Sequence, residues 1–254
     1  MLAGVPEQDL EDLGRKETPG VSTLINTYNE GSLHAALKLR YAGDDGELEV
    51  PVDGYIVDIV RDGLLIEVQT ASFSSMRRKL GALVESHPVL LVHPVPQRTW
   101  IVKAPKPDAP AGTPDAKPSR RLSPKRGSVL TLFDELVSFP TLMAHPNFSI
   151  DVVLTLEDQL RHYDRRRAWR RKGWVIDDRV LLEVVETQRF SDPADFLSLL
   201  PDDLPPRFTT ADLANLLRLP RRLAQRMAYC LRELDLIHEL SRSGRGVVYG
   251  RGEE

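Results

Sequence analysis

The sequence is poor in the residues that build several common kinds of site. A single cysteine among 254 residues excludes an intrachain disulfide framework and a zinc site made of several cysteines. That residue, Cys230, falls in an apolar helical pattern, so we expect it in the core. The six histidines include no pair spaced four apart, which argues against a histidine-based metal site. Neither a glycine-rich phosphate loop nor a Gly-x-Ser-x-Gly motif occurs, so a nucleotide hydrolase or an α/β-hydrolase is disfavoured.

Long apolar runs are also missing. No stretch approaches the roughly 20 apolar residues that a membrane-spanning helix needs. The first 20 residues are acidic and polar, unlike a secretory signal, and we expect residues 1–25 to form a flexible arm. With 41% hydrophobic and 28% charged residues, the composition is that of an ordinary globular protein. We therefore expect a cytoplasmic protein without a membrane partner.

Apolar periodicity in the first part of the chain predicts an α/β core over residues 26–104. The predicted order is helix, three strands, helix and strand, with a parallel crossover between the third and fourth strands. A further short strand is expected near the end of this core. The expected helices are 30–41 and 73–87, and the expected strands are 47–52, 54–61, 64–69, 89–95 and 100–103.

The rest of the chain divides into three predicted parts. Residues 105–127 are rich in proline and read as a linker or exposed loop. Residues 128–190 are expected to form an α+β segment of unassigned fold, in which strands 148–156 and 180–187 pair on either side of a basic hairpin tip. Residues 191–254 predict helices at 195–200, 210–217 and 220–234 and then a hairpin, the order of a winged helix-turn-helix. Thr209 or Thr210 is expected to cap the second of these helices, with Asp212 in its first turn.

One hairpin of the core is predicted to oppose two carboxylates. Asp62-Gly63 is a strong two-residue turn signal between apolar runs. Like charges directly opposed across two strands are destabilising, and a divalent cation between them is the simplest compensation. The alternative is a pair of carboxylates at a strand end that simply reach solvent. Pairing outward from the turn sets Arg61 against Leu64, Val60 against Leu65, Ile59 against Ile66, and Asp58 against Glu67.

This pattern resembles the PD-(D/E)xK, or restriction-endonuclease-like, nuclease superfamily. Asp58, eight intervening residues and Glu67-Val68-Gln69 carry the resemblance, which covers residues 30–103. It implies an αβββαβ nuclease core in which Asp58 and Glu67 bind Mg²⁺ or Mn²⁺ for attack on a phosphodiester. Gln69 stands where a lysine is usual and would orient water or phosphate; it belongs to the Glu-x-Gln variants of the superfamily. Four segments, NEGSLHAALKLRYA, VPVDGYIVDIV, LLIEVQT and RRLAQRMAYCLREL, also resemble a bacterial protein family without an established activity.

Two further residues are candidates for the catalytic site. Lys79, on the helix after the third strand, borders an apolar stripe and could supply the positive charge that Gln69 lacks. Glu30 is in phase with Leu33 and Leu37, and many members of the superfamily have an acidic residue on this helix. The plain alternatives are a solvated lysine, a first-turn glutamate that favours the helix N-terminus, and a Gln69 that is only a strand residue.

The net charge of −3 hides local positive charge. Residues 161–172 hold seven Arg or Lys against one Asp, with Trp169 and Trp174 interleaved or adjacent, a pattern suited to phosphate contacts and base stacking. An exposed charged hairpin or a solvated helix face would explain the same residues. The candidate nucleic-acid contacts are Arg170 and Arg171 in this run, Arg221, Arg222, Gln225 and Arg226 on the predicted third helix of the C-terminal part, and Arg245 at its hairpin tip.

The sequence as a whole predicts a Mg²⁺-dependent deoxyribonuclease whose winged helix docks DNA, and two cuts on a duplex would suit a homodimer. Two alternatives stay open. One is an inactive DNA-binding regulator built on a degenerate nuclease core, which the glutamine at position 69 favours. The other is a protein-assembly module in which the winged helix and the basic run contact protein partners.

Overall fold

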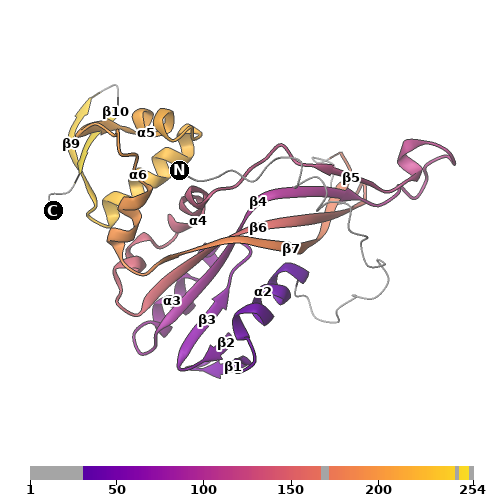
Figure 1. Cartoon of the computed structure of the whole chain (residues 1–254), viewed down its shortest axis with the longest axis horizontal. Coiled ribbons are helices and arrows are strands. Elements are labelled where there is room, and N and C mark those ends of the chain that lie inside the picture. The colour runs from indigo at the N-terminus through magenta and orange to yellow at the C-terminus, as the bar shows by residue number, and fades with distance from the viewer. Residues whose placement is uncertain (1–30, 167–171, 244–245, 252–254) are drawn as a thin grey trace. The chain divides into compact units, whose positions relative to one another are not determined.

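The computed structural model describes residues 31–166, 172–243 and 246–251, which belong to one compact unit (Figure 1). Its helices are α2 (Ser32–Ala42), α3 (Arg77–Leu83), α4 (Phe133–Leu136), α5 (Thr210–Leu216) and α6 (Arg221–Glu233). Its strands are β1 (Glu47–Val52), β2 (Tyr55–Arg61), β3 (Leu64–Val68), β4 (Val89–Lys103), β5 (Ser119–Leu122), β6 (Phe148–Tyr163), β7 (Trp174–Phe190), β8 (Arg207–Thr209), β9 (Ile237–Ser243) and β10 (Gly246–Arg251). Short 3₁₀ helices lie at Phe73–Ser75, Pro114–Ala116, Val129–Leu132, Pro140–Ala144 and Pro193–Leu199.

A large mixed sheet forms the centre of the fold, in the order β1-β2-β3-β4-β6-β7, with β5 paired to the far end of β4. The pairs β3–β4 and β4–β6 are parallel and the others are antiparallel. The predicted order of helix, three strands, helix and strand is confirmed, as is the parallel crossover through α3. The structure thus establishes an α/β protein.

Helices cover both faces of one half of this sheet, the half that contains β2, β3 and the first parts of β4 and β6. On one face, α2 buries Leu33 and Leu37 against a cluster that includes Ile66, Val92 and Val153. On the other face, α3 and α4 pack into a second, larger cluster that continues without a break into the C-terminal elements. In Figure 1 the strands β4, β6 and β7 run on past α2, so that their far half extends beyond the helices.

The strands of residues 89–190 are longer than expected. β4 is one strand of 15 residues, whereas separate strands at 89–95 and 100–103 were predicted. Pro94 and Pro96 lie inside β4, which tolerates them because β3 pairs with β4 only as far as Val92 and β5 pairs with it only from Trp100 on. Between those residues, one edge of β4 has no strand beside it, which is where proline is accepted.

The segment 128–190 is part of the same sheet. The predicted strands 148–156 and 180–187 do pair, but as portions of β6 and β7, which have 16 and 17 residues. The predicted linker also contains a strand, β5. Among the described residues, β7 forms an edge of the sheet, and three register shifts give it one extra residue each, at Asp177, Leu182 and Val185. Such bulges bend a strand and discourage pairing of its edge with another chain.

The C-terminal elements follow the predicted sequence of helix, turn, helix and hairpin. β8, β10 and β9 form a small antiparallel sheet beside α5 and α6. Cys230 on α6 is fully buried, as expected, and burial raises the pKa of its thiol to about 12. No helix among the described residues is both long and apolar enough to cross a membrane.

A capping box begins α5, and Thr209 is the cap of the two threonines that the sequence offered. The Thr209 hydroxyl accepts hydrogen bonds from the backbone N–H groups of Ala211 and Asp212, and the Asp212 carboxylate accepts from the Thr209 N–H at 2.7 Å. Reciprocal bonds of this kind satisfy N–H groups that the first helical turn leaves unpaired.

We therefore expect Thr209→Ala to lower the free energy of unfolding by about 1 kcal/mol in urea denaturation. The matched control is Thr210→Ala, one residue further along, where no cap is lost and a change within about 0.5 kcal/mol is expected. Equal losses in the two variants would contradict the assigned cap.

Candidate active site

The hairpin of β2 and β3 keeps the predicted register for three pairs and departs from it at the fourth. Arg61 pairs with Leu64, Val60 with Leu65, and Ile59 with Ile66. Beyond these pairs, the carboxylates take the place of the backbone ladder. The Asp58 N–H donates to Oε1 of Glu67 at 3.3 Å, and the Val68 N–H donates to Oδ2 of Asp58 at 2.8 Å. The two strands separate here, and both carboxylates are held in the gap.

A lysine and a histidine, one from each helical layer, contact the two carboxylates. Nζ of Lys79, on α3, lies 2.5 Å from Oε1 of Glu67 and donates to the Ile56 carbonyl at 2.5 Å. Nε2 of His34, on α2, lies 3.3 Å from Oδ2 of Asp58. The structure therefore brings Asp58, Glu67 and Lys79 together. Sequence reasoning missed His34, whose only signal was a polar side chain directly after the buried Leu33.

The environment moves the pKa values of the two carboxyl groups in opposite directions. Burial acts first on Glu67, which is only 2% exposed, and together with the nearby charge of Asp58 it raises the pKa despite the Lys79 ammonium. Burial would also raise the pKa of Asp58, but the His34 hydrogen bond, the Val68 N–H and the charges of His34 and Lys79 outweigh it and lower that pKa. Glu67 is thus the carboxylate whose charge the fold tolerates less well.

One oxygen of each carboxylate remains for a ligand. The bonds and ion pairs above use Oδ2 of Asp58 and Oε1 of Glu67, and no described residue donates to Oδ1 or Oε2. Because no buried side-chain oxygen in the described part lacks a hydrogen-bond partner, these two atoms are reached by solvent. No group of three or more His, Cys, Asp or Glu side chains suited to a metal is found among the described residues. Two carboxylate oxygens and several waters nevertheless suit Mg²⁺, which is usually held by one or two carboxylates.

Gln69 lies at the end of β3 with its side chain turned into the following loop. Its amide nitrogen donates to the Ser72 carbonyl at 2.7 Å and to the Ser75 hydroxyl at 3.0 Å. These bonds occupy both N–H groups of the amide, so only the carbonyl oxygen of Gln69 is left to orient water. The other catalytic candidate, Glu30, lies outside the described residues.

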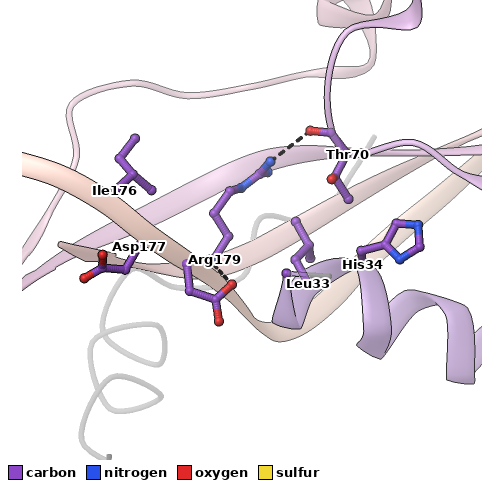
Figure 2. Close-up of a pocket in the computed structure, with 8 residues that line it drawn as sticks. Leu33, His34, Thr70, Ile176, Asp177 and Arg179 are labelled. Atoms are coloured by element: carbon purple, nitrogen blue, oxygen red, sulfur yellow. Dashed lines mark hydrogen bonds between the residues drawn. The ribbon is translucent and has the colours of Figure 1, made fainter. Parts of the chain in front are cut away.

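A shallow pocket of about 190 Å³ includes His34 in its wall (Figure 2). Leu33 and His34 of α2, Thr70 after β3, and residues 176–179 of β7 form its walls, and His34 connects it to Asp58. Arg179 is fixed in this wall because it makes two bonds, of 2.7 and 2.9 Å, to the buried Glu157 and donates to the Thr70 carbonyl at 3.3 Å. The N-terminus of α2 is held at the same place by the Ser32 N–H, which donates to Asp178 at 3.0 Å.

The predicted nucleic-acid contacts of the C-terminal part divide into two groups. Arg221, Arg222 and Gln225 are exposed at the start of α6. Arg226 is instead half-buried, and its Nη1 bonds to the carbonyl and the carboxylate of Asp134 on α4 at 2.8 and 2.5 Å. The structure assigns Arg226 to the contact between α6 and α4. Arg170, Arg171 and Arg245 lie outside the described residues.

Comparison with known proteins shows that the site lies within a domain that other proteins share. Residues 31–191 match the family described as Domain of unknown function (DUF8091). The chain belongs to this family. It is also 32% identical, over 191 residues, to an uncharacterized protein of Treponema pallidum (strain Nichols), covering 75% of this chain and 73% of that protein. No solved structure matches the chain. The DUF8091 match includes Asp58, Glu67, Lys79 and the pocket.

Removing the ammonium group of Lys79 would leave the Glu67 carboxylate buried beside Asp58 without its cation. We expect Lys79→Met to lower the free energy of unfolding at pH 7 by about 3 kcal/mol, because breaking a buried pair leaves a buried charge without its partner. Arg78→Met is the matched control, because Arg78 is exposed on the same helix. Adding Glu67→Gln to Lys79→Met should recover part of the loss, and no recovery would contradict the pairing.

Glu67→Gln should also change how stability depends on pH. The raised pKa means that the folded state holds the Glu67 proton more tightly than the unfolded state. Stability from this group is therefore complete below the ordinary pKa of about 4.3 and is lost as pH rises through the folded pKa. Urea titrations from pH 4 to 8 should show Glu67→Gln gaining stability relative to the parent protein as pH rises. A constant difference across this range would contradict the assignment.

Proposed function

We propose that this protein is a metal-dependent nuclease with a core of the PD-(D/E)xK type. The observation that carries the proposal is the pair of carboxylates at the separation of β2 and β3, each with one solvent-reached oxygen, beside the ammonium of Lys79. The strand order and the parallel crossover through α3 support it, because they match the core that the sequence resemblance implies.

Asp58 and Glu67 would hold the ion, which we propose to be Mg²⁺ or Mn²⁺. Such an ion, when bound, activates water and screens the charge that develops on a phosphodiester. Lys79 would position Glu67 and limit the rise of its pKa, and its ammonium would lie close to an incoming phosphate. Gln69 would contribute only its carbonyl oxygen, to a water, because its N–H groups are bonded within the loop.

The C-terminal elements would act as a winged helix that docks DNA. Their order, β8-α5-α6-β9-β10, and the three-stranded antiparallel sheet support this part of the proposal. The exposed Arg221, Arg222 and Gln225 begin α6, which is the helix that such modules place in the major groove. A cytoplasmic location and a homodimer that makes two cuts are further parts of the same proposal.

A second candidate function is that of an inactive DNA-binding protein. Lys79 and His34 already compensate both carboxylates within the protein, and the N–H groups of Gln69 are occupied. A core that retains this charge balance without a metal would still be stable, and its role would be to bind nucleic acid.

Cleavage assays with two conservative variants test the proposal. Plasmid and linear DNA are incubated with the protein in Mg²⁺ or Mn²⁺, and we expect Asp58→Asn and Glu67→Gln each to lower the cleavage rate at least about a hundredfold, because charge at the metal is lost. The asparagine can still accept the Val68 N–H. Asp53→Asn is the matched control, since Asp53 is exposed in the β1–β2 turn and pairs with His87.

The possible outcomes separate the candidates. Cleavage that persists in both site variants would place the chemistry elsewhere. DNA binding without cleavage in either metal would favour the inactive DNA-binding protein. Calorimetric titration of Mn²⁺ adds a direct test of the site, because binding should be lost in Asp58→Asn and kept in Asp53→Asn.

A further inference from the structure

The far half of the large sheet carries a group of basic side chains that the proposed chemistry does not use. Arg121 is exposed on β5, while Lys103 at the end of β4, Lys106 after it and Arg161 on β6 are half-buried. We call these four residues the basic arm. Partial burial, together with the charges of Arg121, Arg161 and Lys106, lowers the pKa of Lys103.

Strand register places the arm on the same face of the sheet as α2 and the pocket. Alternate residues of β6 share a face, and Val153, which packs under α2, is in phase with Arg161. Lys103 is the β4 partner of Arg161, and Arg121 is the β5 partner of Ile101, two residues before Lys103. On the other side, Arg161 pairs with Ile176, which lines the pocket. From Ile176 to Lys103 is two strand spacings, or roughly 10 Å.

Aromatic rings hold two of the ammonium groups in place. Nζ of Lys103 lies 4.2 Å from the centre of the Trp174 ring, and Nζ of Lys106 lies 5.2 Å from that of Tyr163. Acidic groups near the arm have partners of their own. Asp177 contacts His162, and Asp178 accepts from the Ser32 N–H. Asp115 instead pairs with Lys106 of the arm at 2.6 Å, so Lys103, Arg121 and Arg161 carry most of the positive charge of the arm. The arm thus combines fixed positive charges with an extended shape.

We propose that the basic arm binds the sugar–phosphate backbone of a nucleic acid, and that the strand continues from the arm over the pocket toward Asp58 and Glu67. A linear row of cations is complementary to evenly spaced phosphates. Ile176 is exposed beside this row, but the Trp174 and Tyr163 rings are half-buried and lie under lysines, so the apolar surface here is small and a membrane surface is the poorer fit. The path toward the carboxylates rests on the proposed nuclease function, whereas the binding does not.

Fluorescence anisotropy in EDTA tests the binding without cleavage. The probes are a fluorescein-labelled 20-nucleotide single strand and a 20-base-pair duplex, titrated with the full chain over a range of salt concentrations. For Lys103→Gln combined with Arg121→Gln we expect affinity to fall about tenfold or more at 0.1 M salt. The slope of log K against log salt should become shallower by roughly 1.4 for the single strand or 1.8 for the duplex, as two phosphate contacts are lost.

The matched control is Arg77→Gln combined with Arg78→Gln, which removes the same charge from exposed positions of α3 on the opposite face. Both double variants must keep the melting temperature of the parent protein.

Equal losses of affinity in the two double variants, or no loss in the arm variant, would overturn the proposal. Binding to phosphatidylserine vesicles but not to either oligonucleotide would overturn it as well. If the arm variant alone loses binding while the parent protein never cleaves DNA, the arm stands and the nuclease function fails. If the parent protein cleaves DNA while the arm variant binds normally, the nuclease function stands and the arm proposal fails.

Discussion

The meeting of two carboxylates where β2 and β3 separate constrains both helical layers of this protein. Glu67 is buried beside Asp58, and two like charges in that position would destabilise the hairpin if nothing compensated them. α3 supplies Lys79 from one side of the sheet and α2 supplies His34 from the other. The positions of the two helices are therefore tied to the charge of this pair as well as to their apolar contacts.

The turn residues predicted the register of the hairpin correctly for three pairs. The prediction failed at the fourth pair, where carboxylate side chains accept the hydrogen bonds that backbone carbonyls would otherwise accept. The turn at Asp62-Gly63 sets the register because its geometry propagates outward pair by pair, and three pairs follow it. At Asp58 the carboxylate competes successfully with a backbone carbonyl for the Val68 N–H, and pairing rules do not include that competition. Lys79 was predictable from its place beside an apolar stripe. His34 was not, because its partner depends on how α2 crosses the sheet.

The far half of the sheet was beyond local reasoning because its stability depends on distant partners. Glu157 and Asp158 look like the solvated end of a strand, yet both are buried, and Arg179 and Arg120 neutralise them. Bulges in β7 shift its alternation three times, so the pattern of apolar residues no longer has a period of two. A proline at position 96 adds a false break in β4. Each of these signals becomes clear only when the neighbouring strand is known.

The charge balance of the site explains why a bound polyanion would need contacts elsewhere. Lys79 is already 2.5 Å from Glu67, whose pKa is raised, and a phosphate nearby would disfavour the Glu67 charge further. Attraction must then come from other cations, on the face of the sheet that carries the pocket and the basic arm. Screening at physiological salt acts over about 8 Å, so cations some 10 Å from the pocket attract weakly from a distance and act mainly by direct contact. Lys103 and Arg121 would therefore hold the strand along its length, and their effect would appear in its salt dependence more than in the chemistry.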